Sequence, residues 1–304
     1  QGVSGTITKK GNMAEMRIRG LEIGVETTNI KTADFSWRTS FVYSRSSNEV
    51  TKLLTNPTIQ DMVGYNSQSA TSQGGFAKEG YPLKSLFSVP FNGLNSSGLP
   101  TFTNQQGDAT INGIRFDSQD VDFLKYSGTL IPTDKGSLSN TINYKGISLG
   151  VVLTYSYGNV VRLRGMRNIY NDYSTVPREL NNRWQYAGDE NKTDIPVLYT
   201  TYMYQRLFNG WKEMNQAYLT YDYSDVRIAK GDNIRLKEIS LGYTFDKNFL
   251  RESRIRQLSL KLQATNIALL YADKKLNGDD PDYLANGYAP IPPKRLIFTL
   301  RVGL

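Results

Sequence analysis

The stretch Ile147-Ser-Leu-Gly-Val-Val-Leu-Thr-Tyr-Ser-Tyr157 decides the fold, because large apolar side chains alternate with small ones along it. Successive side chains of a strand point to opposite faces of a sheet. One face then carries Ile147 and every second residue up to Tyr157, and the other carries Ser148, Gly150, Thr154 and Ser156. A small polar face suits a water-filled lumen better than the packed core of a β-sandwich. The stretch therefore predicts one strand of a transmembrane β-barrel.

The last nine residues repeat this alternation up to the end of the sequence. One face carries Leu296, Phe298, Leu300, Val302 and Leu304, and the other carries Thr299, Arg301 and Gly303. Chain ends that make no contacts fray and are usually polar. Apolar alternation that continues to the last residue therefore favours a strand that ends at a bilayer interface.

Five further stretches show the same period of two. With the two above, they predict seven strands: Leu21–Val25, Phe35–Tyr43, Leu83–Phe91, Ile147–Tyr157, Ile239–Phe245, Leu258–Ala264 and Leu296–Leu304. Pro90 weakens the third, because proline cannot donate a hydrogen bond to a neighbouring strand. The apolar phase slips by one residue between Leu236 and Ile239, which predicts a β-bulge near Lys237 and Glu238.

The predicted strands are joined by connections of very different length. Residues 27–34 and 246–254 are short connections, whereas 158–233 and 267–295 are long. Outer-membrane barrels have short periplasmic turns and long extracellular loops. If the last strand ends in the periplasm, alternation of strand direction makes the strand around Leu21 run from the outside toward the periplasm. No earlier predicted strand is then available to pair with it. Because unpaired amides are costly in hydrocarbon, we expect the chain to be the C-terminal part of a larger barrel.

The composition excludes several other classes. The 304 residues include 20 Tyr, 12 Phe and 3 Trp, and no apolar run is long enough for a transmembrane helix. Cysteine and histidine are absent, which excludes disulfides, Cys-based metal sites and imidazole catalysis. The net charge of +8 comes from Lys and Arg spread along the chain, so we expect no nucleic-acid partner. A soluble β-sandwich or propeller segment remains an alternative.

Seven phrases follow one another along the chain: Arg19–Val25, Asp34–Ser44, Glu79–Phe87, Asn143–Leu149, Gly231–Phe245, Gly278–Asp282 and Pro292–Val302. In this order and spacing they resemble the C-terminal barrel portion of SusC/RagA-type TonB-linked outer-membrane transporters. Two departures stand out. Leu304 is found where family members usually end on an aromatic residue, and the family's TonB box, plug domain and N-terminal domain have no counterpart here.

The resemblance implies an all-β fold, in which this chain supplies about seven strands of a large antiparallel transmembrane barrel with about 22 strands. It also implies a SusC-like importer of oligosaccharides or oligopeptides, with no cofactor and no catalytic residue. The implied partners are a SusD-like surface lipoprotein, TonB acting through the absent plug, and a second barrel-lid pair. The implied location is the outer membrane of a Gram-negative bacterium. A siderophore or metal-chelate receptor and a passive porin are the alternatives.

The long connection between residues 160 and 233 carries a cluster of aromatic residues. The candidate substrate contacts are Trp184, Tyr199, Tyr202, Tyr204, Trp211 and Tyr221. Aromatic rings stack on sugars or peptide side chains, and tyrosine hydroxyls form directional hydrogen bonds. An equally open alternative is that some belong to the aromatic girdle of the membrane interface and others pack the loop on itself.

Three basic residues, Arg38, Lys261 and Arg301, fall on the small polar face of the predicted strands. Inside a barrel they would point into the lumen, where they could attract an anionic substrate. We favour pairing with carboxylates of the plug, because charges inside a plugged barrel are usually neutralised.

Two acidic segments could each be either an ordinary turn with solvated charges or a functional site. Asp273–Asp282 looks like a calcium loop, but Leu284 stands where an EF-hand needs glutamate, so we expect an ordinary turn and no metal. Asp189 and Glu190 could serve a glycosidase without histidine. They lie in a Gly-Asp-Glu-Asn turn, however, and we expect solvated charges there and no enzyme.

Overall fold

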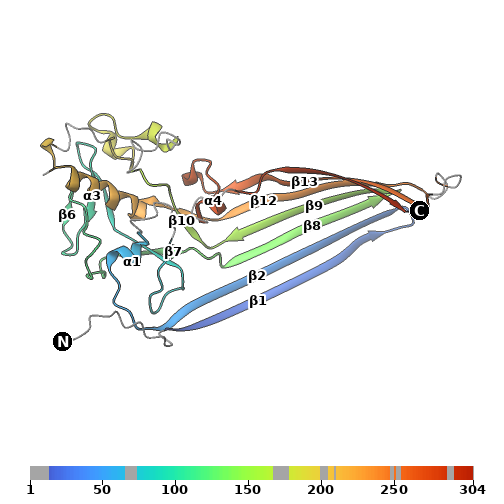
Figure 1. Cartoon of the computed structure of the whole chain (residues 1–304), viewed down its shortest axis with the longest axis horizontal. Coiled ribbons are helices and arrows are strands. Elements are labelled where there is room, and N and C mark those ends of the chain that lie inside the picture. Colours follow the sequence, from blue (N-terminus) through green and yellow to red (C-terminus); the bar gives the residue numbers. More distant parts are fainter. Residues whose placement is uncertain are drawn as a thin grey trace, which may run out of the picture.

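The structure is a computed structural model that describes residues 14–65, 74–166, 178–198, 205–208, 210–246, 250, 255–285 and 291–303. An antiparallel sheet of seven long strands forms one half of an elongated molecule, and a region of loops forms the other half (Figure 1). The strands of this sheet are β1 (Ala14–Lys31), β2 (Phe35–Leu53), β8 (Asp134–Tyr144), β9 (Ile147–Tyr157), β12 (Asn233–Thr244), β13 (Gln257–Ala272) and β14 (Arg295–Gly303).

The seven strands form a meander, because their order in the sheet follows the chain. Six of the seven predicted stretches coincide with these strands, and the predicted number is also correct. The prediction of a strand of this sheet at Leu83–Phe91 is wrong. Its place between β2 and β9 is taken by β8, which sequence alternation did not identify.

The alternation of β8 is interrupted at two positions of its apolar side. At one of them, the Asn140 side-chain oxygen accepts hydrogen bonds from the Trp37 indole nitrogen at 2.9 Å and the Thr39 hydroxyl at 2.7 Å. At the other, Gly136 leaves room for Tyr155, whose hydroxyl would lie 2.3 Å from a β-carbon added there. Gly136 and Asn140 are explained by their contacts with neighbouring strands and not by an intrinsic preference for strands. Strand propensity therefore did not identify β8.

The segment around Leu83–Phe91 lies in the loop region instead. Its strand, β3 (Ser85–Ser88), is buried at all four residues and pairs with β7 (Lys125–Thr129). The strand ends before Pro90, where the sequence predicted weakness. A short apolar run does not distinguish a membrane strand from a strand buried on both faces.

The register of the sheet places the predicted apolar rows on one face. Ile147 lies opposite Tyr144 and Tyr243, and Leu149 lies opposite Ile142 and Leu241. The outer strands continue this face with Ile23, Val25, Phe41, Leu262, Leu296, Phe298 and Leu300. These side chains are open to the outside, with Leu296 73% and Phe298 66% exposed. The aliphatic rows therefore do not meet one another across a sealed interior.

Aromatic residues mark both ends of this apolar face. The row beside the short turns contains Phe35, Tyr144 and Tyr243. The row nearer the loops contains Tyr43, Tyr155 and Tyr271. Eight residues separate Ile147 from Tyr155, about 27 Å along a strand, which is close to the roughly 25 Å apolar band between the aromatic girdles of outer-membrane barrels.

The predicted bulge in β12 is confirmed. The pairing of β12 shifts between Leu236 and Glu238 relative to both of its neighbours, β9 and β13, so Lys237 is the extra residue. Its ammonium donates a 2.7 Å hydrogen bond to the side chain of Asn266 on β13. Because of this extra residue, Leu236 and Ile239 both face the apolar side.

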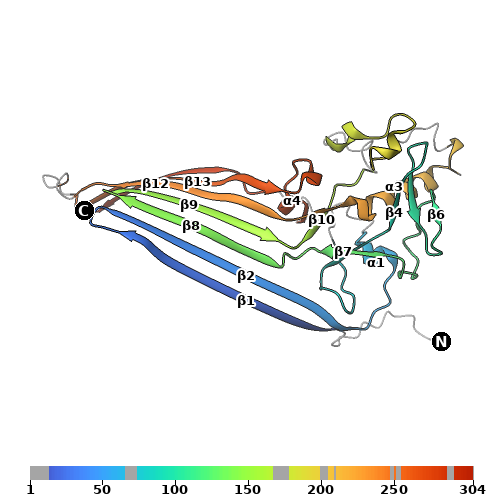
Figure 2. The same cartoon turned by 180° about the vertical axis from the view of Figure 1, so that it is seen from behind.

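The connections divide by length between the two ends of the sheet. Short connections, residues 32–34, 145–146 and 245–256, lie at one end, and long ones, 54–133, 158–232 and 273–294, lie at the other (Figure 2). Lys145 and Gly146 form a two-residue hairpin turn with φ of 44° and 87°. β1 starts at the loop end and β14 finishes at the turn end, as strand parity predicted.

The long connections fold together into a loop region with its own core. Its helices are α1 (Ile59–Val63), α3 (Trp211–Asp222), α4 (Pro281–Ala285) and the 3-10 helices η1 (Arg178–Asn182), η2 (Asp189–Asn191), η3 (Asp225–Arg227) and η4 (Lys274–Leu276). Its remaining strands are β4 (Phe91–Leu94), β5 (Pro100–Thr103), β6 (Ala109–Thr110), β10 (Val160–Arg162) and β11 (Ile228–Lys230). One core cluster joins the first two connections, and another joins the second and third. Within the described ranges, no helix has the length and apolar character needed to cross a membrane.

Candidate functional site

The polar face of the sheet is the first candidate surface. Small residues from neighbouring strands lie opposite one another on it, in the pairs Ser40 and Ser139, Ser137 and Thr154, Gly150 and Ser240, and Ser148 and Gly242. This arrangement confirms the small polar character predicted from β9. A face of this kind can border water, because its hydroxyl groups can be solvated.

All three predicted basic residues lie on this polar face. Arg38 lies 3.5 Å from the Glu26 carboxylate of β1, and Lys261 lies 4.0 Å from the Glu238 carboxylate of β12. Arg301 is exposed on β14, opposite Ser259. The structure therefore spaces the three cations across the sheet and brings two of them near carboxylates of adjacent strands.

Tyr221 belongs to the core of the loop region. It is 1% exposed and contacts the ring of Phe91 edge-on at a centroid distance of 5.8 Å. Burial raises the pKa of its hydroxyl well above the ordinary value, so the side chain is neutral at physiological pH. This position favours the alternative interpretation of the aromatic cluster at Tyr221, namely packing of the loop on itself.

Trp184 is half-buried and already has partners. Its indole nitrogen donates a 3.0 Å hydrogen bond to Glu190, and its ring lies so close to Gly98 that an added β-carbon would come within 2.4 Å. Gly98 also has a φ of 73°. Trp184 thus joins the first long connection to the second, with its polar edge occupied.

The four remaining aromatic candidates lie in or beside the segment that precedes α3. Tyr199, Tyr202 and Tyr204 lie outside the described residues, so their substrate contact stays a prediction. Trp211 is the first residue of α3, the helix whose buried residues Met214, Ala217 and Tyr218 pack with Leu99 and Phe208. Of the candidates whose side chains the structure describes, Trp184 and Tyr221 both pack within the loop region.

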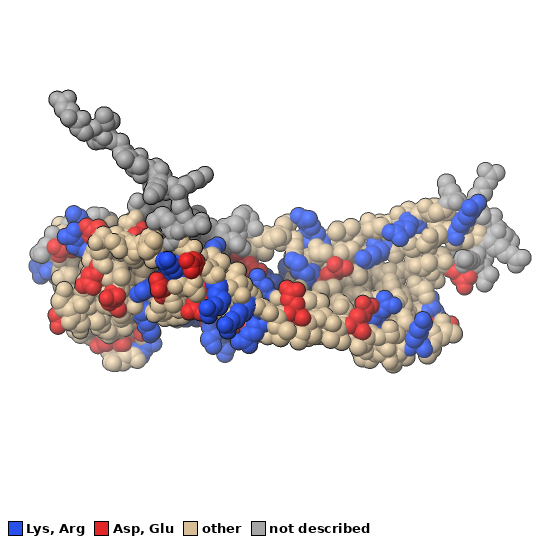
Figure 3. Space-filling model, turned by 90° about the horizontal axis from the view of Figure 1, so that it is seen from below, with Lys and Arg blue, Asp and Glu red and all other residues tan. Residues whose placement is uncertain are grey.

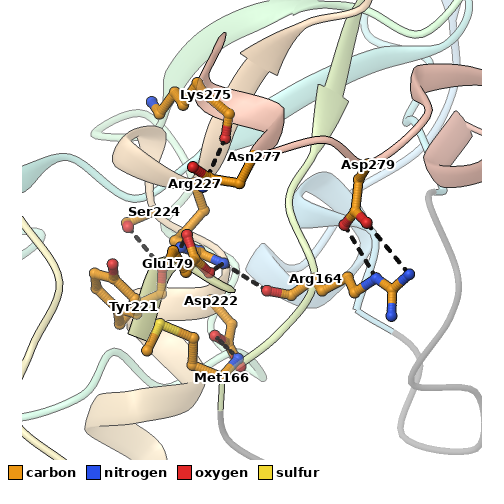
Figure 4. Close-up of polar contacts among 10 residues, drawn as sticks. All are labelled: Arg164, Met166, Glu179, Tyr221, Asp222, Ser224, Arg227, Lys275, Asn277 and Asp279. Carbon is orange, nitrogen blue, oxygen red and sulfur yellow. Dashed lines mark hydrogen bonds and ion pairs between the residues drawn. The ribbon is translucent and has the colours of Figure 1, made fainter. Parts of the chain in front are cut away.

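A buried ion pair that the sequence did not reveal joins η1 to η3 (Figure 4). Both terminal nitrogens of Arg227 donate to Glu179, at 2.9 and 2.7 Å, and the side chains of the pair are 2% and 9% exposed. Arg227 also donates to the Arg164 carbonyl, and its guanidinium lies over the Tyr221 ring. The two partners are 48 residues apart, and no spacing rule connects them.

A pocket of about 590 Å³ opens beside this ion pair. Its lining combines both signs of charge with side-chain amides, and includes Glu179, Asn182, Arg183, Asp194, Arg227 and Lys275. A second pocket of about 590 Å³ lies at the bulge and is lined by Arg235, Lys237, Asn266, Asp280, Pro292 and Lys294, among others. Both pockets are polar enough to accept hydrogen-bonding ligands.

The acidic segment between β13 and β14 is held by arginines. Arg235 of β12 pairs with Asp280 through two hydrogen bonds and lies 2.9 Å from Asp282. Arg164 lies 3.1 Å from Asp279. These carboxylates therefore neutralise cations of neighbouring elements. The predicted turn is found at Asn277 and Gly278, with φ of 52° and 91°, whereas Pro281 begins α4. No group of metal ligands is found among the residues that the structure describes.

Asp189 and Glu190 serve the local turn. The Tyr186 amide and Lys192 lower the pKa of Asp189, and the Trp184 indole and backbone amides lower the pKa of Glu190. A glycosidase needs one carboxylic acid with a raised pKa to protonate the leaving group. Both shifts go the other way, which argues against this pair as an acid catalyst.

Comparisons with known proteins point to one family. The chain is 24% identical over 289 residues to TonB-dependent receptor P3 of Formosa agariphila, covering 92% of this chain and 26% of the relative. It is also 24% identical over 306 residues to TonB-dependent receptor P39 of the same organism, covering 85% of this chain and 27% of that relative. No protein-family model matches the chain.

The fold of the chain is also similar to that of solved structures. The RagAB peptide transporter aligns with a TM-score of 0.64 at 18% identity, covering 95% of this chain and 29% of that chain. The RagAB peptide importer in its closed-closed state aligns with a TM-score of 0.63 and the same coverage.

These comparisons confirm the resemblance to SusC/RagA-type TonB-linked transporters and the antiparallel barrel fold. The names of the relatives, receptors and transporters, agree with the prediction that the chain is no enzyme. The chain spans about a quarter of the length of the relatives it matches.

Proposed function

We propose that this chain forms the C-terminal strands and outer loops of a SusC-like TonB-dependent importer in the outer membrane of a Gram-negative bacterium. The observation that carries the proposal is the division of the sheet into an exposed apolar face with aromatic ends and a small polar face. Lipid would contact the first and the aqueous lumen the second. The folded loop region at one end would form part of the outer mouth.

The imported ligand is an oligomeric nutrient, either an oligosaccharide or an oligopeptide. Support for the peptide comes from the RagAB structures, which are of a peptide importer. The polar pocket beside the Arg227–Glu179 pair, the more apolar pocket at the bulge and several aromatic residues of the loop region suit either ligand. The transporter works by shape, binding and gating, with no covalent step assigned to this chain.

The partners of the proposed importer are a SusD-like lipoprotein lid, TonB acting on the plug, the remaining barrel strands and a second barrel-lid pair. The test is affinity purification of the complete transporter from its native outer membrane, followed by uptake of labelled oligomers. A SusD-like lipoprotein should co-purify, and uptake should stop when the lid or TonB is removed.

Other outcomes would replace the proposal. Uptake of a ferric chelate without any lid protein would identify a siderophore receptor. A barrel lumen that conducts ions without a plug would identify a passive porin. Recovery of the protein from the soluble fraction without detergent would reject a membrane function altogether.

A further inference from the structure

The outward face of the β1–β2 hairpin changes character just beyond the apolar band. On β1, the residues that share a face with Ile23 and Val25 are Leu21, Arg19 and Arg17, because side chains alternate along a strand. On β2, Arg45 lies opposite Leu21 in the register. Three arginines therefore extend the outward, apolar face of the sheet toward the loop region.

The side chains of these arginines are accessible to a ligand. Arg17 and Arg19 are exposed, and neither forms an ion pair with any residue in the described part of the chain. Arg45 is also exposed and lies 3.9 Å from Asp134, whose carboxylate accepts 2.6 Å hydrogen bonds from Tyr43 and Thr133. Glu49 lies opposite Arg17, but not within ion-pair distance.

The arginines follow one another outward from the aromatic row, Arg45 first, then Arg19 and then Arg17. Arg45 is two residues beyond Tyr43 of the aromatic row, and Arg19 is four residues beyond Ile23, which is paired with Tyr43, so Arg19 lies about 13 Å further along the strand. Figure 3 shows Lys and Arg side chains gathered where the long strands meet the loop region. In a barrel, the aromatic row marks the interface, and the next layer outward contains the lipid headgroups.

We propose that Arg17, Arg19 and Arg45 form a binding site for a phosphate group of a glycolipid in the outer leaflet. The inference rests on the proposed membrane function. Arg19 and Arg45 are diagonal neighbours across the hairpin, about 7 Å apart at their β-carbons, so both guanidinium groups can reach one phosphate. Arginine forms paired hydrogen bonds with phosphate oxygens, which gives such a site geometry as well as charge.

The experiment measures binding of lipid A to the complete transporter purified in detergent, by native mass spectrometry. Each headgroup-level cation contributes about fivefold in affinity, so the R17Q/R19Q variant should bind roughly thirtyfold more weakly. The control is Lys135→Gln, because Lys135 is exposed next to the level of Arg45 but on the opposite face of the sheet. K135Q should bind lipid A as tightly as the wild type does. Dephosphorylated lipid A should bind the wild type about as weakly as lipid A binds R17Q/R19Q.

Several results would overturn the inference: equal binding by wild type and R17Q/R19Q, equal loss in K135Q, or binding of inorganic phosphate alone without lipid A. If R17Q/R19Q does not fold, R17K/R19K keeps the charge and should bind with intermediate affinity, because it loses the paired hydrogen bonds. Fractionation of the wild type to the outer membrane is scored separately. A wild type absent from that fraction contradicts the proposed function, whereas normal fractionation with unchanged lipid binding contradicts only this inference.

Discussion

Arg227 and Glu179 illustrate what a single residue contributes to the loop region. The Arg227 side chain is 2% exposed, and its charge is compatible with that burial only because Glu179 accepts two of its hydrogen bonds. The Arg164 carbonyl accepts a third. Since η1 and η3 are distant in sequence, this pair fixes two parts of the second long connection against each other.

Replacement of Arg227 by methionine should loosen the loop region strongly. A buried carboxylate left without its partner costs about 3–5 kcal/mol, which corresponds to roughly 150- to 5,000-fold faster amide exchange around η1 and η3. Hydrogen–deuterium exchange of the complete transporter measures this directly.

The R227M/E179L double variant removes both charges and should recover much of the protection. The control is Asp117→Asn, which breaks the exposed pair with Arg115 and should leave exchange unchanged. Equal exchange in R227M and the control would contradict the role of the buried pair.

At the scale of elements, the sequence identified strands better than loops. The alternation of β9, β12 and β14 is complete enough to predict both faces, and the slip at Lys237 predicted the bulge. β8 was missed because Gly136 and Asn140 depend on cross-strand partners that alternation does not encode. The loop pairings, such as Arg235 with Asp280, join segments 45 residues apart and leave no local signal.

The segment that contains α4 should detach from β12 in acid. Burial raises the pKa of Asp280, but the hydrogen bonds and charge of Arg235 outweigh burial and lower it below the ordinary value. A depressed pKa in the folded state stabilises the attachment at pH above about 4 and loses that contribution as pH falls further.

Limited proteolysis or hydrogen exchange of residues 273–285 between pH 7 and pH 3 tests this attachment. Protection should fall below about pH 4 in the wild type. In D280N, the segment should be less protected already at neutral pH and less sensitive to acid. Protection that is independent of pH in the wild type would refute the ion-pair anchor.

At the scale of the whole molecule, the sheet is open. In the part of the chain that the structure describes, β1 and β14 are the outermost strands of the seven-stranded sheet. In lipid, each backbone amide on such an edge needs a partner. We therefore propose that the remaining barrel strands pair with both edges, as expected for a chain that matches about a quarter of its relatives.

This chain expressed alone should fail to form a membrane barrel, because two of its strands would expose unpaired edges to hydrocarbon. The complete transporter should run as a compact, heat-modifiable species on a gel when it is not boiled. The chain alone, mixed with the same lipids or detergent, should not. A heat-modifiable band from the chain alone would show that its edges close without additional strands.

The facing pattern of β9 is the central claim, and single-cysteine spin labels along Ile147–Tyr157 test it most directly. This chain contains no native cysteine, so within it an introduced cysteine is the single site for a label. In the complete transporter reconstituted in bilayers, labels at Leu149, Val151 and Leu153 should collide with lipid-dissolved oxygen. Labels at Ser148, Gly150 and Thr154 should collide with a water-soluble nickel chelate, giving a period of two. Labels at the first three positions that are shielded from both reagents would indicate a packed protein core and contradict the account.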